Sequence, residues 1–206
     1  MRERKLLIVG AGGHGRVVAD IAEQLSVYSE IVFADDAGTA VQSKYLLIGS
    51  CKAAEEYVKD YEIVVAVGNA AARRCLHERF ESLGAKFATL VHSSAVVSPS
   101  AIIGDGTVIM PGGIVNAGAV IGKGVIINTA SSVDHDCVVD DYCHIAVGAR
   151  LCGTVRVGKN TWVGAGVTVI NNVSICGDCM IGAGAVVVSN LDRAGTYLGV
   201  PARLQE

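Results

Sequence analysis

From residue 97 onward an aliphatic side chain recurs at every sixth position without interruption. A period of six fits neither the 3.6-residue turn of an α-helix nor a plain hairpin. It fits a triangular solenoid of short strands, in which three hexads make one coil of 18 residues. The C-terminal part of the chain is therefore predicted to be a parallel β-helix. The sixteen residues of the series are Val97, Ile103, Ile109, Val115, Ile121, Ile127, Val133, Val139, Ile145, Leu151, Val157, Val163, Val169, Ile175, Ile181 and Val187.

Residues 1–91 follow a different pattern, in which apolar stretches of strand length alternate with stretches of helical character. This βαβαβ order predicts a small parallel sheet with helices packed on it, resembling half of a dinucleotide-binding fold. We therefore expect an α/β domain over residues 1–91 and an all-β domain of hexapeptide repeats over residues 92–206. The predicted strands are 5–10, 31–34, 63–68 and 86–91, and the predicted helices are 15–25, 52–58 and 70–83.

Composition agrees with a repetitive β architecture. The 206 residues are 51% hydrophobic, yet only 5% are aromatic and 25 are glycine, so the core must consist of small and β-branched side chains. Four positions after each member of the aliphatic series the side chain is usually small or β-branched. The net charge is -3 and no basic cluster is present, which argues against a nucleic-acid partner.

The seven cysteines predict no disulfide framework. Their number is odd, and the first apolar run, residues 6–9, is far too short for a signal peptide or a membrane span. We therefore expect a cytoplasmic protein with reduced thiols. Cys137, Cys143 and Cys179 occupy the small position of their hexads and are interpreted as packing residues. Cys176 and Cys179 form a lone C-x-x-C, a weak signal for a metal or redox site.

A glycine-rich segment, Gly10-x-Gly12-x-x-Gly15, follows the first predicted strand and precedes the first predicted helix. Asp35 lies about twenty residues further on, the spacing of a dinucleotide fingerprint. Three interpretations remain open: an NAD site, a site for the diphosphate of a UDP-sugar, or a tight turn without a ligand. Only one mononucleotide half precedes the solenoid, which favours the UDP-sugar.

His135 is the candidate catalytic base. It lies two positions after the inward Val133, at a corner of the solenoid, and Asp134 and Asp136 flank it. A neighbouring carboxylate makes an imidazole more basic, as proton abstraction requires. Gly153 lies 18 positions later, hence one coil above at about 4.8 Å. Its backbone N–H is either an oxyanion donor or part of a turn that needs glycine.

These motifs, together with Val67-Gly68-Asn69 and the final Gly199-Val200-Pro201-Ala202, resemble the sugar O- and N-acyltransferases related to sialic acid O-acetyltransferase. The similarity is greatest to the UDP-4-amino-sugar N-acetyltransferases of the bacillosamine pathway. The resemblance implies a left-handed β-helix, acetyl-CoA as co-substrate, a UDP-amino-sugar as acceptor, and a homotrimer with active sites at subunit interfaces. It also implies a role in glycan biosynthesis and protein glycosylation.

The resemblance also implies roles for individual residues. His135 is the general base, supported by Asp136, where some relatives carry the longer glutamate. His144, Ala165 and Ala183 contact acetyl-CoA. The coil spacing, not the resemblance, adds Gly153 as the candidate contact to the thioester carbonyl. No metal is expected. The N-terminal domain holds the nucleotide-sugar, for which the candidate residues are Gly12, Gly13, His14, Asp35, Asp36 and Gly68.

The expected reaction is direct attack of the 4-amino group of a UDP-linked amino-dideoxy sugar on acetyl-CoA. O-acetylation of a sialic acid and N-acetylation of another nucleotide-linked amino sugar are alternatives of the same kind. An NAD-dependent enzyme, a metal-dependent hydratase and a non-catalytic scaffold are alternatives of other classes. The hydratase would need about three histidine ligands, and the hexad run contains only His135 and His144.

Overall fold

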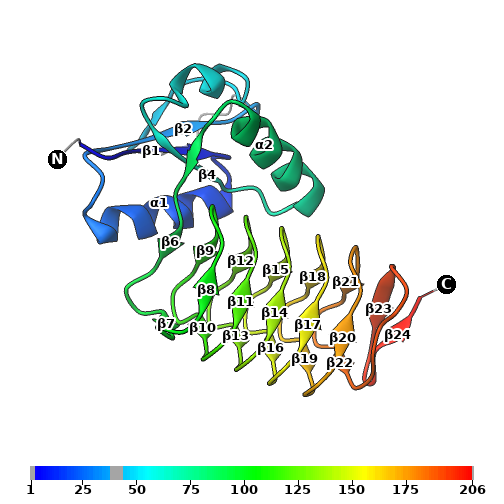
Figure 1. Cartoon of the computed structure of the whole chain (residues 1–206). Helices are drawn as coiled ribbons and strands as arrows, with labels where there is room; N and C mark the ends of the chain where they lie inside the picture. The colour runs from blue at the N-terminus through cyan, green and yellow to red at the C-terminus, as the bar shows by residue number, and fades with distance from the viewer. Residues whose placement is uncertain (1–2, 38–43, 206) are drawn as a thin grey trace. The chain divides into compact units, whose positions relative to one another are not determined.

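The computed structural model describes residues 3–37 and 44–205. The chain divides into two compact units, Met1–Ser93 and Ser94–Glu206. The first unit contains a β-sheet and the two α-helices, and the second consists of stacked short strands (Figure 1).

The first unit is built on a five-stranded parallel sheet with the strand order β3-β2-β1-β4-β5. Residues Leu6 to Val9 of the central strand have no exposed surface. Such a continuous apolar run is typical of a parallel strand covered on both faces. The strands are β1 (Lys5–Val9), β2 (Glu30–Ala34), β3 (Leu46–Leu47), β4 (Glu62–Val65) and β5 (Lys86–Phe87).

Helices cover both faces of this sheet. The α-helix α1 (Gly13–Leu25) packs against β1 and β2 through its buried Val18, Ala19 and Ile21. The 3-10 helix η1 (Ala53–Tyr57) and the α-helix α2 (Ala70–Ser82) contribute to the other hydrophobic cluster, where Ala54 and Phe80 are fully buried. The two faces use alternate residues of β1, as the two-residue period of a strand requires.

The strand order places a topological switch point between β1 and β4. The chain moves from β1 outward to β2 and β3, and it then returns to β4 on the opposite side of β1. In open α/β sheets, ligands bind beyond the carboxyl ends of the strands at such a point. The carboxyl ends of β1 and β4 are followed by Gly10 and Ala66, respectively.

Three details of the first unit differ from the sequence prediction. The strand predicted at 86–91 is two strands, β5 and β6 (Leu90–Val91), because only β5 continues the five-stranded sheet. The helix predicted at 52–58 is the shorter 3-10 helix η1. The strand β3 was missed, because two residues show no periodicity.

The second unit contains sixteen two-residue strands, each ending on one member of the aliphatic series. Pairing joins residues 18 positions apart, as in Val115 to Val133 and Val133 to Leu151. The strands are β7 (Val96–Val97), β8 (Ile102–Ile103), β9 (Val108–Ile109), β10 (Ile114–Val115), β11 (Val120–Ile121), β12 (Ile126–Ile127), β13 (Ser132–Val133), β14 (Val138–Val139), β15 (His144–Ile145), β16 (Arg150–Leu151), β17 (Arg156–Val157), β18 (Trp162–Val163), β19 (Thr168–Val169), β20 (Ser174–Ile175), β21 (Met180–Ile181) and β22 (Val186–Val187).

These strands form the three flat faces of a solenoid. One face has the order β22-β19-β16-β13-β10-β7, the second has β20-β17-β14-β11-β8, and the third includes β21-β18-β15-β12-β9. Two further strands, β23 (Thr196–Leu198) and the antiparallel β24 (Arg203–Leu204), close the third face. The unit is the left-handed parallel β-helix that was predicted (Figure 1).

The interior of the solenoid is filled by the two predicted positions of each hexad. From Ile109 to Val187 every member of the aliphatic series is at most 2% exposed. The small positions are buried as well, and their hydroxyl groups are hydrogen-bonded: Thr107 Oγ1 donates to Gly122 O, and Ser131 Oγ donates to Asn128 O. The hydroxyl groups of Thr107 and Ser131 are therefore satisfied within a narrow cross-section.

The corners from Gly106 to Gly184 each turn through a residue with positive φ. From Gly106 to Gly184 this residue recurs at every sixth position, three after the inward aliphatic residue. Glycine adopts this conformation without strain, and Asn and Asp tolerate it better than other residues. Asp136, at φ 57°, and Asp178, at φ 58°, are two such corner residues. The corner geometry therefore fixes the backbone conformation of Asp136, from which the carboxylate extends.

Candidate active site

His135 and Asp136 form a hydrogen-bonded pair at an exposed corner of the solenoid. His135 Nδ1 lies 2.9 Å from Asp136 Oδ2, and the imidazole side chain is 54% exposed. An ionised carboxylate only accepts hydrogen bonds, so Nδ1 carries the proton and Nε2 presents a lone pair. The hydrogen bond that Nδ1–H donates to Asp136 raises the pKa of His135 above its ordinary value. The shorter carboxylate thus reaches the ring.

Asp134 holds the backbone rather than the ring. Its Oδ1 accepts a hydrogen bond from the His135 N–H at 2.8 Å and another from Asn116 Nδ2 at 2.9 Å. Asn116 lies one coil before Asp134, and its hydrogen bond is the main reason that the pKa of Asp134 is lowered. The two aspartates that flank His135 therefore have different functions: one orients the imidazole, and the other fixes the peptide.

Because Gly153 has no side chain, the His135 ring can occupy the space beside it. A Cβ at residue 153 would lie 2.4 Å from Nε2 and 2.6 Å from Cε1 of His135, so a side chain there would displace the imidazole. The φ of Gly153 is not positive, so the corner itself does not require glycine here. Its N–H makes no hydrogen bond to any residue in 3–37 or 44–205. The imidazole therefore lies against Gly153, whose N–H has no partner in the described part of the chain.

His144 lies on the outer surface of β15, where two neighbours hold it. Its Nε2 is 2.9 Å from Asn128 Nδ2, and its ring stacks on Trp162 with 5.6 Å between centroids and 4° between planes. Ala165 and Ala183 are exposed one coil apart, and Gly184 N donates to Ala165 O. The small alanine side chains leave the backbone at this corner accessible.

The four glycines of the N-terminal loop fall into two groups. A Cβ on Gly15 would lie 1.9 Å from Gly10 O, and a Cβ on Gly10 would lie 2.7 Å from Ala66 O, so helix and strand packing requires both glycines. Gly12, by contrast, has no atom within 4 Å of its Cβ position, and Gly13 has only the far end of Arg16 at 4.0 Å. Fold packing does not explain Gly12 or Gly13, which lie in open space.

Asp35 and Asp36 connect loops at the carboxyl edge of the sheet. Asp35 Oδ2 accepts from the Ala11 N–H at 2.7 Å, and Asp35 Oδ1 accepts from the Ala37 N–H at 2.8 Å. Asp36 Oδ1 accepts from the Cys51 N–H at 2.8 Å. The structure thus brings Asp35 to the glycine-rich loop, as the fingerprint predicts, and shows that its carboxylate also holds that loop in place.

Gly68 and His14 lie beyond the carboxyl ends of β4 and β1. Gly68, like Gly12, has no atom within 4 Å of its Cβ position. The buried Arg73 donates through Nη1 to the carbonyl oxygens of Val67 and Gly68, at 2.8 and 2.9 Å. Burial, together with the Arg73 guanidinium, lowers the pKa of His14 to about 4, so its imidazole is neutral. His14 Nε2 is buried without a hydrogen-bond partner among the described residues.

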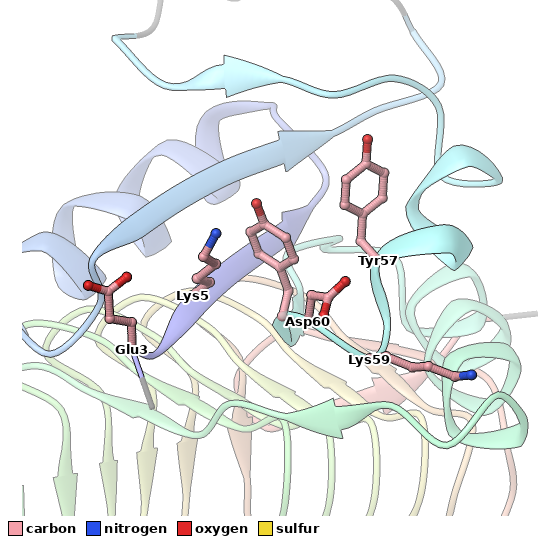
Figure 2. Close-up of a pocket in the computed structure, with 6 residues that line it drawn as sticks. Glu3, Lys5, Tyr57, Lys59 and Asp60 are labelled. Atoms are coloured by element: carbon pink, nitrogen blue, oxygen red, sulfur yellow. The ribbon is translucent and has the colours of Figure 1, made fainter. Parts of the chain in front are cut away.

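A surface pocket of about 490 Å³ occupies the opposite edge of the sheet (Figure 2). It is lined by residues near the amino ends of β1 and β4, including Lys5 and Tyr61, and by Tyr57 at the end of η1. Lys5 Nζ forms an ion pair with Glu30 Oε2 at 2.8 Å, and Tyr61 OH donates a hydrogen bond to the same oxygen. This pocket contains none of the predicted site residues.

The structure adds residues that sequence reasoning missed, namely Asn116, Asn128, Trp162 and Arg73. Asn116 lies 18 positions before Asp134, and Trp162 pairs in register with His144. The coil spacing that located Gly153 would have found both of them. Within residues 3–37 and 44–205, no group of three or more His, Cys, Asp or Glu side chains is arranged to hold a metal ion, and neither α-helix has the length and apolar character of a membrane span.

Comparison with known proteins places the chain among sugar-modifying enzymes. Residues 5–80 match the family model described as the PglD N-terminal domain. The chain is 32% identical over 174 residues to GDP-perosamine N-acetyltransferase of Escherichia coli O157:H7, covering 81% of this chain and 78% of that protein. It is 38% identical over 105 residues to UDP-N-acetylbacillosamine N-acetyltransferase of Bacillus subtilis (strain 168), covering 49% of each chain.

Solved structures agree over almost the whole length. The acetyltransferase domain of PglB from Neisseria gonorrhoeae FA1090, in complex with acetyl coenzyme A, is 42% identical with a TM-score of 0.95, covering 98% of this chain and 100% of that chain. PerB from Caulobacter crescentus, in complex with CoA and GDP-perosamine, is 34% identical with a TM-score of 0.90, covering 98% and 97%. The chain therefore belongs to the acetyl-CoA-dependent nucleotide-sugar N-acetyltransferases, as the resemblance predicted.

Proposed function

We propose that this enzyme transfers the acetyl group of acetyl-CoA to the 4-amino group of a UDP-linked amino-dideoxy sugar, with His135 as the general base. The observation that carries the proposal is the His135–Asp136 hydrogen bond of 2.9 Å, made at an exposed corner with Nε2 against Gly153. The two curated relatives differ in the nucleotide of the substrate in their names. The Escherichia coli protein is a GDP-perosamine N-acetyltransferase, and the Bacillus subtilis protein is a UDP-N-acetylbacillosamine N-acetyltransferase. The uridine assignment follows the similarity to the bacillosamine enzymes.

The proton of the acceptor amine passes to His135 Nε2 as the nitrogen adds to the thioester carbonyl. Nδ1 is committed to Asp136, so only Nε2 is available to accept a proton. Asp136 stabilises the imidazolium that results, which is why the pair is more basic than an isolated imidazole. Asp134 fixes the peptide of His135 and so limits the positions that the ring can adopt.

Gly153 is proposed to stabilise the oxyanion. Gly153 lies against the ring of the proposed base, and its N–H has no hydrogen-bond partner in the described part of the chain. Donors placed where negative charge develops account for a large share of the rate of acyl transfer. The CoA thiolate then leaves, and no cysteine or serine nucleophile takes part.

The acetyl-CoA site is proposed to run past His144, Ala165 and Ala183. Stacking on Trp162 and the contact with Asn128 hold His144 in one orientation on the surface. The exposed alanines permit close approach of an extended pantetheine arm to the backbone. The Neisseria protein to which this chain is similar binds acetyl coenzyme A, and the assignment of these three residues follows the family resemblance.

The nucleotide-sugar is proposed to bind at the switch point between β1 and β4. Gly12, Gly13 and Gly68 lie there with open space at their Cβ positions, so a diphosphate can approach the backbone closely. The N-terminus of α1 favours an anion at the same place. The neutral His14 offers a hydrogen bond to the sugar or the diphosphate, and Asp35 and Asp36 are the proposed partners of the ribose side.

The proposed assembly is a homotrimer with active sites at the subunit interfaces, in the cytoplasm. An apolar stripe supports it: Ile102, Val120 and Val138 are stacked outward-facing residues of β8, β11 and β14, and the first two are 63% and 37% exposed. Contiguous exposed apolar surface of this kind marks contact with another molecule. A second solenoid beside this face would bury the stripe and give the acetyl-CoA groove a second wall.

The function is tested by measuring thiol release from acetyl-CoA with a panel of acceptors. The panel contains UDP- and GDP-linked 4-amino sugars, their 4-hydroxy counterparts and free sialic acid. We expect turnover with the UDP-linked amino sugar to exceed that with all others. Preference for the GDP-linked amino sugar would contradict the uridine assignment, and turnover with the hydroxy sugars alone would contradict N-acetylation. Calorimetry with UDP-sugar and with NAD separates the three interpretations of the glycine-rich loop, because a tight turn without a ligand would bind neither.

A further inference from the structure

Two thiols near the C-terminal end of the solenoid lie in contact. Cys176 Sγ and Cys179 Sγ are 3.5 Å apart, and neither is in a disulfide. They flank the corner formed by Gly177 and Asp178, between β20 and β21. Cys179 fills a small interior position, as expected, but packing does not require a second sulfur directly against it. The proposed acetyl transfer uses neither thiol.

The two thiols differ in access to solvent. Cys176 is partly exposed, whereas Cys179 is only 3% exposed and its Sγ lies 3.7 Å from both Gly177 O and Arg193 O. Burial raises the pKa of the Cys179 thiol to about 12, so it stays protonated at neutral pH. A reagent in solution therefore meets Cys176 first. A partly exposed thiol next to a buried one is the arrangement of an attacking and a resolving cysteine.

We propose that Cys176 and Cys179 form a reversible dithiol–disulfide site whose co-reactant is a low-molecular-weight disulfide. Cys176 gives up its proton, and its thiolate attacks one sulfur of the reagent. The reagent's S–S bond breaks, a mixed disulfide forms on Cys176, and one small thiolate leaves. Cys179 then loses its proton as it attacks Cys176 Sγ, and a second small thiolate leaves. The protein loses two electrons and two protons, and the reagent is reduced to two thiols.

The local backbone suits this closure. The sulfurs are already at van der Waals contact, so a bond requires them to move closer by about 1.5 Å, given an S–S length of about 2.05 Å. Asp178, between them, adopts the positive-φ corner conformation and donates its N–H to Lys159 O, which keeps the corner tight. The closed loop is short, so the disulfide restricts the unfolded chain little and contributes little stability. Formation of the disulfide is therefore best detected chemically, and not by a change in stability.

The site is tested on the whole folded protein with 4,4′-dithiodipyridine, followed by quenching in acid, alkylation and tryptic mapping. Cleavage after Lys159 and Arg193 releases residues 160–193, which contain both thiols and no other cysteine. Residues 75–79 carry the exposed Cys75 alone and serve as the internal control. We expect peptide 160–193 to be unalkylated, without adduct and two hydrogen atoms lighter than the dithiol, while peptide 75–79 retains the pyridylthio adduct. Dithiothreitol should restore both.

Two variants locate the steps. Cys179→Ser should retain the adduct on Cys176, and Cys176→Ser should leave Cys179 unmodified during the time that closes the wild-type pair. A wild-type peptide 160–193 that keeps one or two adducts, or that remains an alkylatable dithiol while Cys75 is fully modified, would overturn the proposal. This comparison within the wild-type chain holds even if a variant fails to fold.

Discussion

The imidazole of His135 lies in the space that a side chain at Gly153 would occupy, with Nε2 only 2.4 Å from the Cβ position. The two residues are 18 positions apart and hence in neighbouring coils. A glycine in one coil thus leaves the space in which the imidazole of the preceding coil lies. Because the φ of Gly153 is ordinary, the room needed by the His135 ring explains this glycine better than backbone conformation does.

Gly153→Ala should lower kcat by roughly a hundredfold, because displacing a catalytic group by about 1 Å costs this much. The new methyl group would push the ring away without altering the interior, so the melting temperature should change little. Asn171→Ala, at the same corner one coil later, is the matched control and should be near normal. Full activity of Gly153→Ala would show that the ring has other productive positions.

Asp136→Asn should move the acidic limb of the pH–rate profile to lower pH. The carboxylate raises the pKa of His135 in the intact enzyme, so the base is active only above that raised value. Removing the charge lowers the pKa, and the base becomes available at lower pH while its maximal rate falls. Asp178→Asn carries the same change at a corner with nearly the same φ and should leave the profile unchanged. An acidic limb that stays in place would show that it does not report His135.

Gly12→Ala and Gly15→Ala should have opposite effects within one loop. Alanine at residue 12 meets no protein atom, so the fold should persist while KM for the nucleotide-sugar rises about tenfold and KM for acetyl-CoA is unchanged. Alanine at residue 15 would collide with Gly10 O and should destabilise the protein by about 1–3 kcal/mol or more. Steady-state kinetics and thermal denaturation separate the two effects. An unchanged nucleotide-sugar KM in Gly12→Ala would place the substrate elsewhere.

The solenoid could be predicted almost residue by residue, because each coil repeats one local pattern and pairs with the next at a fixed interval. The same interval located Gly153 beside His135, and it would also have located Asn116 beside Asp134. The contact of Asn128 with His144 spans 16 positions and crosses a corner, so no fixed spacing predicts it. The switch point between β1 and β4 depends on strand order, which the sequence pattern leaves undetermined.

Val120→Asp should break the proposed trimer into monomers. The substitution places a charge in the centre of the apolar stripe on β8, β11 and β14, where burial against a second chain would leave it unpaired. Light scattering measures the mass, and Thr168→Asp, on an outward position of β19 on another face, is the control. A wild-type chain that is monomeric and fully active at nanomolar concentration would contradict the shared-site assembly.

The most direct test of the central claim is kcat for His135→Ala, measured by thiol release with the UDP-linked 4-amino sugar, alongside acetyl-CoA affinity measured by calorimetry. The exposed corner imidazole contributes little to the packed interior, so the variant should fold and bind acetyl-CoA normally. General-base catalysis usually supplies about 10²–10⁴-fold, so kcat should fall by that factor. His144→Ala should mainly weaken acetyl-CoA binding. Near-normal turnover of His135→Ala at neutral pH, with loss of turnover in His144→Ala, would contradict the assignment of the base.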